Sequence, residues 1–218
     1  MTRRTTKFTP RAATALLVVS VLAAGCTATG RERARSAREG LQEAHDRLAS
    51  ARTGAERARD ELDVLLTTSG ADLAPLYDAF DESVAALRDE ARAVARLPGQ
   101  LRARGDAYFE RWEAERAGIQ DPKLRATSAA RRAEAMATYD RAVTAMTSQQ
   151  PVFDALLSLL DDARLALGND LTPDGVDAVR EVSGRVAQET KAVGERIEAL
   201  IAEVEAVGAA LSTSVPAG

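Results

Sequence analysis

The spacing of apolar residues constrains this 218-residue chain more than any other feature. Apolar side chains recur alternately three and four residues apart in two long stretches, one at each end of the chain. This repeat of roughly 3.5 residues is typical of left-handed coiled coils, in which each helix presents one apolar seam to its partners. The first seam comprises Ala34, Ala37, Leu41, Ala44, Leu48, Ala51, Ala55, Ala58, Leu62 and Leu65. The last comprises Val176, Val179, Ser183, Val186, Thr190, Val193, Ile197, Leu200, Val204, Val207 and Leu211.

Turn-forming residues interrupt the sequence at three places, where Gly, Asn, Asp, Pro, Ser and Thr gather. The interruptions lie at 67–70, 118–122 and 168–175. They leave four segments of about 40 residues, each roughly 60 Å long as an α-helix. These segments are 31–67, 72–118, 121–167 and 173–213. We therefore predict an all-α fold, an elongated antiparallel bundle of about four long helices with coiled-coil packing.

Pro98 and Pro151 stand inside the two middle segments, where each raises the question of a helix break. The second segment carries a seam of Leu73, Tyr77, Phe80, Val84, Leu87, Ala91, Val94, Pro98, Leu101, Gly105, Tyr108 and Trp112. The third carries Tyr139, Val143, Met146, Gln150, Phe153, Leu157 and Leu160. Both seams pass the proline in phase, and unrelated helices rarely share a register across a loop. We therefore predict one long helix that is kinked at Pro98, or two nearly collinear pieces, and we favour a kink over a turn at Pro151.

The first 26 residues resemble an export signal. Four basic residues and no acidic ones precede a mostly apolar run from Ala12 to Ala24. This run is shorter than the roughly 20 residues that span a bilayer. Gly25 is the small residue expected before a lipidated cysteine, and Cys26 is the only cysteine of the chain. We predict cleavage after Gly25 and lipidation of Cys26. The alternative is an ordinary signal peptide cut nearby, which leaves a free thiol.

Lipidation of Cys26 would set the domain boundaries and the location. The signal peptide is 1–25, a lipid-anchor linker 26–30, the helical bundle 31–213 and a flexible tail 214–218. The mature protein would be a lipoprotein of the cell envelope that faces the periplasm, held in the membrane through its acyl chains. Because Thr27 and not Asp follows the cysteine, sorting to an outer membrane is favoured where one exists.

The charge balance excludes nucleic acid as a predicted partner. Removing the four basic residues of the signal leaves 25 Lys and Arg against 33 Asp and Glu, so the net charge changes from −4 to −8. Binding to a phosphate backbone requires a basic surface.

Three short stretches resemble a family of bacterial envelope lipoproteins known only as a domain of unknown function. They are 76–78 (Leu-Tyr-Asp), 108–113 (Tyr-Phe-Glu-Arg-Trp-Glu) and 124–125 (Leu-Arg). The resemblance covers most of the mature chain and implies a helical fold and an envelope location. It carries over no activity, cofactor or site residue. Pro98 and Gly99 depart from members whose second helix is uninterrupted.

Charge is distributed unevenly along the predicted rod. With alternating helices, residues 56–90 and 150–185 form the half far from the lipid, with 17 acidic and 6 basic residues. The rest of the mature chain has 16 acidic and 19 basic residues. This pattern predicts an upright rod whose basic end faces anionic headgroups. The alternative is that the charges only solvate helix faces.

One stretch, 170–181, partly matches a calcium-binding EF-hand loop. Asp170, Asp174 and Glu181 occupy positions 1, 5 and 12 of such a loop, but Thr and Pro stand at positions 3 and 4. The same residues also fit a helix start, with Thr172 as N-cap and proline at the first helical position. The helix start is the favoured interpretation because it explains every residue without a metal, and calcium stays the alternative.

No other residues are spaced for catalysis. His45 is the only histidine and falls beside the first seam, so neither a Ser-His or Cys-His pair nor a zinc set is expected. The aromatic residues Tyr108, Phe109 and Trp112 are predicted to pack in the core, with a membrane-interface role as the alternative. We predict no enzyme, no cofactor and no metal.

Two functions remain as hypotheses. The first is a membrane-anchored scaffold, spacer or adaptor for another envelope component or for a second copy, with contact at the far tip, near Ser69 and Asn169. The second is a regulatory bundle that binds a small molecule or an ion. Gly105 on the second seam would mark either a gap for such a ligand or close packing. A dry, alanine-packed core favours the first function and a polar cavity the second.

Overall fold

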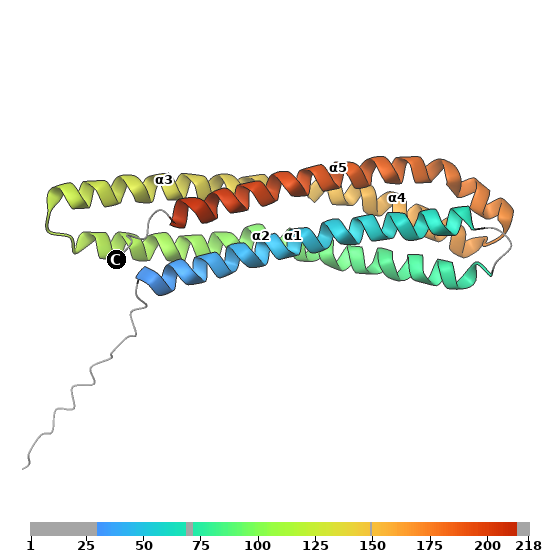
Figure 1. Ribbon diagram of the computed structural model, residues 1–218, viewed down its shortest axis with the longest axis horizontal. Helices are drawn as coiled ribbons and strands as arrows, with labels where there is room; N and C mark the ends of the chain where they lie inside the picture. Colours follow the sequence, from blue (N-terminus) through green and yellow to red (C-terminus); the bar gives the residue numbers. More distant parts are fainter. Residues whose placement is uncertain (1–29, 69–71, 149, 213–218) are drawn as a thin grey trace, which may run out of the picture.

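The computed structural model describes residues 30–68, 72–148 and 150–212. Every regular element in these ranges is an α-helix: α1 Gly30–Thr67, α2 Ala74–Ala117, α3 Pro122–Thr147, α4 Gln150–Asn169 and α5 Pro173–Ser212. Figure 1 shows an elongated bundle in which α3 and α4 follow one another along one line. The predicted all-α antiparallel bundle is confirmed.

Helices α1, α3 and α4 each pack against two neighbours, and α2 and α5 each pack against three. Helix α1 lies between α2 and α5, and the successive pieces α3 and α4 close the bundle between α2 and α5 on the opposite side. The core of this arrangement is apolar, with many alanine and leucine side chains from α1 and valine side chains from α5. Only Ser83 and Thr190 are buried polar residues in the described part of the chain. Alanine-rich seams allow close helix approach, and apolar side chains form almost all of the described core.

The two predicted outer seams agree well with the burial pattern. Every seam position from Leu41 to Leu65 in α1 is buried. In α5 every seam position is buried except Ser183, which is half-buried. The heptad spacing thus identified the buried face of both helices correctly. It did so because α1 and α5 are packed against other helices along their length.

Helix α2 runs through Pro98 without interruption, as predicted. Pro151 behaves differently, and the prediction of one kinked helix over 121–167 is wrong. Helix α3 ends at Thr147 and α4 begins at Gln150, so the bundle has five described helices where about four were predicted. A proline lacks the N–H that would bond to the carbonyl four residues earlier, and its ring crowds that carbonyl. Here that carbonyl belongs to Thr147, where α3 stops.

The buried face of α2 changes after Pro98. The seam predicted Pro98, Tyr108 and Trp112 as core positions, but all three are half-buried. The buried residues are instead Leu97, Leu101, Gly105 and Phe109, at regular intervals of four. A straight helix with about 3.6 residues per turn drifts away from a 3.5-residue seam, and a spacing of four corrects this drift.

Two tyrosines pack closely against glycines of a neighbouring helix. The Tyr139 hydroxyl donates to the Leu101 carbonyl at 2.6 Å, and a Cβ placed on Gly105 would lie 2.9 Å from two ring atoms of Tyr139. The Tyr77 hydroxyl donates to the Arg164 carbonyl at 3.2 Å and would lie 2.6 Å from a Cβ on Gly168. In both pairs the accepting carbonyl lies one helical turn before the glycine. Gly105 therefore marks close packing with Tyr139, and it also contributes to the lining of a cleft of about 220 Å³ between α2 and α3.

Candidate functional site

Of the residues predicted from sequence to have a role, Cys26 and Ser69 lie outside the described residues. Asn169 is the last residue of α4 and is exposed. It lies at the end of the bundle opposite to the start of α1 (Figure 1). The helix order thus places the start of α1 and the end of α4 at opposite ends of the bundle. Helix α1, with 38 residues, gives their separation as roughly 57 Å.

The stretch 170–181 adopts the predicted helix start. Asp170 Oδ1 accepts hydrogen bonds from the Thr172 hydroxyl at 2.6 Å and from the Thr172 amide at 3.2 Å. The Thr172 hydroxyl in turn accepts from the Gly175 amide at 3.4 Å, as an N-cap does. Asp174 and Glu181 both lie within α5. In the described ranges no group of three or more His, Cys, Asp or Glu side chains is arranged to hold a metal ion. Calcium stays the alternative prediction.

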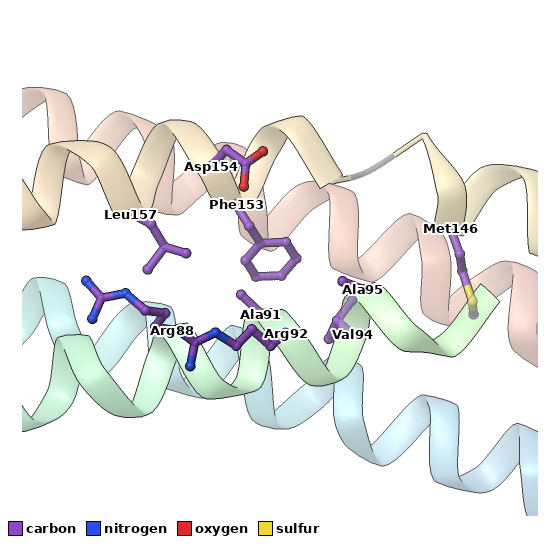
Figure 2. Close-up of a pocket in the computed structure, with 9 residues that line it drawn as sticks. All are labelled: Arg88, Ala91, Arg92, Val94, Ala95, Met146, Phe153, Asp154 and Leu157. Atoms are coloured by element: carbon purple, nitrogen blue, oxygen red, sulfur yellow. The ribbon is translucent and has the colours of Figure 1, made fainter. Parts of the chain in front are cut away.

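A cleft of about 310 Å³ opens where α3 gives way to α4. Figure 2 shows Phe153 and Leu157 pointing from α4 toward α2, where Ala91 leaves space opposite them. Val94, Ala95 and Met146 continue this apolar lining. The cleft is therefore a consequence of a helix break that faces small side chains.

Charged side chains border this cleft. Arg88 and Arg92 of α2 and Asp154 of α4 contribute to its lining. The Arg88 guanidinium is paired with Asp161, and Arg92 Nη1 lies 2.8 Å from Asp89 Oδ1. Both cations thus already have carboxylate partners, which lowers their availability to an anionic ligand. An apolar group fits the cleft best.

Arg88 also belongs to a set of ion pairs that joins α2 to α4. Arg164 of α4 lies 3.1 Å from Asp81 and 3.5 Å from Asp161, while Asp161 pairs with Arg88. The hydrogen bond to Asp81 is the main cause that raises the pKa of Arg164. These four side chains are 29–46% exposed, so their contribution is to fix the position of α4 against α2 more than to add stability.

His45 and Tyr139 are the two side chains whose surroundings bear on a role in proton transfer. His45 Nδ1 lies 3.4 Å from Asp46 Oδ1 on the surface of α1. Tyr139 is the titratable group that departs most from its ordinary behaviour, since burial raises its pKa to about 12. A hydroxyl with that pKa that donates to a carbonyl has a structural role.

Sequence reasoning missed the cleft and the ion pairs. A usable signal was present for the cleft, since the small residues Ala91 and Ala95 lie one turn apart on α2 and face the α3–α4 junction. No comparable signal existed for the ion pairs, because a partner on another helix depends on register. The predicted aromatic cluster does form: Phe109 is buried, and its ring centroid lies 5.1 Å from that of Tyr108 and 6.4 Å from that of Trp112.

The fold and its surface thus define an elongated all-α bundle without a recognisable catalytic centre in the part that the structure describes. The family model for "Protein of unknown function (DUF2959)" matches residues 28–211. The chain belongs to this family, and the predicted membership of a family of unknown function is confirmed to that extent. Neither the curated proteins nor the solved structures contain a match to the chain. None of the described helices is both long and apolar enough to cross a membrane.

Proposed function

We propose that this chain is an envelope lipoprotein that acts as a spacer or adaptor, with its far end presented to another envelope component. The observation that carries the proposal is the helix order. The start of α1, which follows Cys26 closely in the sequence, lies at one end of the bundle (Figure 1). The end of α1, the start of α2 and the α4–α5 connection lie at the other end, roughly the length of α1 away.

The charge distribution supports an upright orientation. With the helices arranged as described, residues 56–90 and 150–185 lie in the half that carries 17 acidic and 6 basic residues. An anionic lipid surface repels this half and attracts the other, in which basic residues are in excess. The acidic far end also favours a basic protein surface over an anionic glycan as the component that it contacts.

The nature of the core supports a spacer over a ligand-binding bundle. Ser83 Oγ is satisfied by the Phe80 carbonyl at 2.8 Å, so Thr190 is the one buried hydroxyl without a partner in the described residues. A spacer needs a rigid, well-packed body and no internal cavity. The cleft at the α3–α4 junction favours the second candidate function, binding of an apolar group from a small molecule or partner.

Site-specific photo-crosslinking in cells tests the spacer proposal. A photoreactive amino acid is placed at Asn169, and at the exposed residue Ala103 of α2 as a matched control near the other end. The expected result is a discrete crosslinked partner from Asn169 that is absent from Ala103. Crosslinks between copies of the chain from both positions would instead indicate a self-assembling rod, and equal labelling of a partner from both would refute contact at the tip.

A fluorescent apolar dye tests the second candidate. Ala91→Leu fills the cleft with an apolar side chain, while Ala103→Leu adds the same groups at an exposed position outside it. Loss of dye binding in the first variant alone would support a binding cleft. Unchanged dye binding in both would remove it.

A further inference from the structure

The end of the bundle where α1 begins is formed at its extremity by the α2–α3 hairpin. Figure 1 shows this hairpin projecting beyond the first turn of α1 and beyond the last turn of α5. The turn between α2 and α3, residues 118–121, is therefore the outermost described part of this end. We call residues 116–125 the apex of the hairpin.

The apex has a fixed conformation. Asp121 Oδ1 accepts a hydrogen bond from the Leu124 amide at 2.8 Å and caps α3. Arg125 donates from Nε and from Nη2 to the Ile119 carbonyl at 2.8 Å and 2.5 Å. Just behind the apex, Arg132 Nε donates to the Phe109 carbonyl at 3.0 Å. The side chains that the apex presents are thus held in place before any partner arrives.

Leu124 is the most exposed large apolar side chain of the described residues, at 62%. Lys123 and Arg125 flank it. Arg116 lies in the last turn of α2 and is paired with Glu113, so Lys123 and Arg125 are the cations that lie next to Leu124. An outward apolar side chain surrounded by cations suits the boundary between lipid headgroups and acyl chains. Trp112 and Tyr108, residue types that favour this depth, lie about one to two turns behind the apex on α2.

We propose that the apex rests on the anionic bilayer, with Leu124 entering the boundary between headgroups and acyl chains. This inference rests on the proposed function, because the bilayer is placed by the lipid on Cys26. Cys26 precedes Gly30 by four residues, which span at most about 14 Å when extended. The lipid is therefore kept at the end of the rod that carries the apex. The hairpin then gives the rod a second contact with the membrane and holds it upright.

Two matched tryptophan probes test the contact. Trp112, the only tryptophan of the chain, is replaced by Phe, and a single tryptophan is introduced by Leu124→Trp or by Leu165→Trp. Leu165 is 55% exposed on α4, close to the opposite end. The lipidated full chain is reconstituted in phosphatidylglycerol vesicles whose acyl chains carry bromine, a contact quencher. The expected result is strong quenching of the Leu124→Trp probe and none of the Leu165→Trp probe.

The outcomes separate this inference from the proposed function. Quenching of neither probe in chains with lipidated Cys26 would overturn the apex contact and leave the spacer proposal intact. Equal quenching of both would mean that the rod lies flat, which overturns the apex contact and the upright spacer together. Mass spectrometry that finds Cys26 unmodified, with the chain absent from the membrane fraction, would refute the proposed function and the contact that depends on it. Weaker quenching of the Leu124→Trp probe when Lys123→Gln is added would support a contribution of Lys123 to membrane contact.

Discussion

The packing of Tyr139 on Gly105 leads to a prediction that reverses the usual effect of a helical glycine. Alanine in a helix interior is ordinarily more stable than glycine by about 1 kcal/mol. At Gly105, however, the new Cβ would lie 2.9 Å from both Cδ1 and Cζ of Tyr139, which is closer than such atoms approach. The Tyr139 ring would have to move, and its hydroxyl would leave the Leu101 carbonyl, now at 2.6 Å.

The magnitude follows from these opposing effects. Crowding of a packed core costs typically 1–3 kcal/mol. A buried hydroxyl that loses its acceptor costs roughly another 1–3 kcal/mol. After the gain of about 1 kcal/mol from helix propensity, we expect Gly105→Ala to lower the free energy of unfolding by about 1–5 kcal/mol. For a chain of this size that corresponds to a melting temperature lower by roughly 2–20 °C.

Gly99→Ala is the matched control on the same helix. A Cβ at Gly99 would have no atom within 4 Å, so only the propensity gain remains and the melting temperature should rise. Thermal and urea unfolding followed by circular dichroism compare the two variants. In a Tyr139→Leu background, Gly105→Ala should become neutral or stabilising. If Gly105→Ala stabilises the wild-type chain as much as Gly99→Ala does, Tyr139 does not pack on Gly105 and the reasoning is refuted.

Three further predictions concern single groups. Thr190→Val should raise the free energy of unfolding by about 1–2 kcal/mol, because it removes a buried hydroxyl without a partner; urea unfolding checks this, and a loss of stability would mean that the hydroxyl has an acceptor. Tyr139 has its pKa raised to about 12 by burial, so its contribution is complete below the unfolded pKa near 10 and is lost as the pH rises toward 12. Stability should therefore fall over that pH range, and fall less in Tyr139→Phe; equal slopes would contradict the assignment. Millimolar calcium should leave the melting temperature unchanged, because Asp170 already accepts from Thr172 and α5 is helical from Pro173, whereas a rise that Asp174→Asn abolishes would restore the calcium loop.

The sequence predicted the architecture because heptad spacing reports directly on which face of a helix is buried. The same spacing failed to distinguish Pro98 from Pro151, although the seam passes both in phase. The seam continues in phase from Met146 of α3 to Phe153 and Leu160 of α4, whereas the buried face of α2 shifts after Pro98. The local backbone also differs between the two places. Before Pro151, Thr147 and Ser148 donate their hydroxyls to the carbonyls of Val143 and Ala145 at 2.9 Å and 2.8 Å. Such side chains compete for backbone carbonyls and favour a helix end, and Pro98 has no such neighbours.

The candidate sites were less predictable from sequence than the fold. The helix start at Thr172 depends on contacts within a few residues, and local reasoning identified it correctly. The cleft and the ion pair between Arg88 and Asp161 depend on which residues of α2 and α4 lie level with one another. That register follows from the lengths of the connections and from packing such as that of Tyr77 on Gly168, which a single sequence does not display.

Pro98 of α2 and the break between α3 and α4 lie at nearly the same level of the rod. Met146, at the end of α3, lines the cleft together with Val94 and Ala95 of α2, so the helix break faces the turn that precedes Pro98. Helix α2 lacks one backbone hydrogen bond there, and α3 and α4 are discontinuous. Helices α1 and α5 are unbroken over their whole lengths, and so they carry the rod past this level.

This arrangement predicts uneven protection of backbone amides from hydrogen exchange. Amides at 99–102 and 152–154 should exchange faster than those of buried residues in the middle of α1, such as Leu48, and of α5, such as Val204. The physical reason is that missing hydrogen bonds and an open cleft lower the free energy of local opening. Mass spectrometry of peptides from deuterated protein measures the difference. Equal protection in these two segments and in α1 and α5 would mean that the break is closed in solution and that the cleft does not persist.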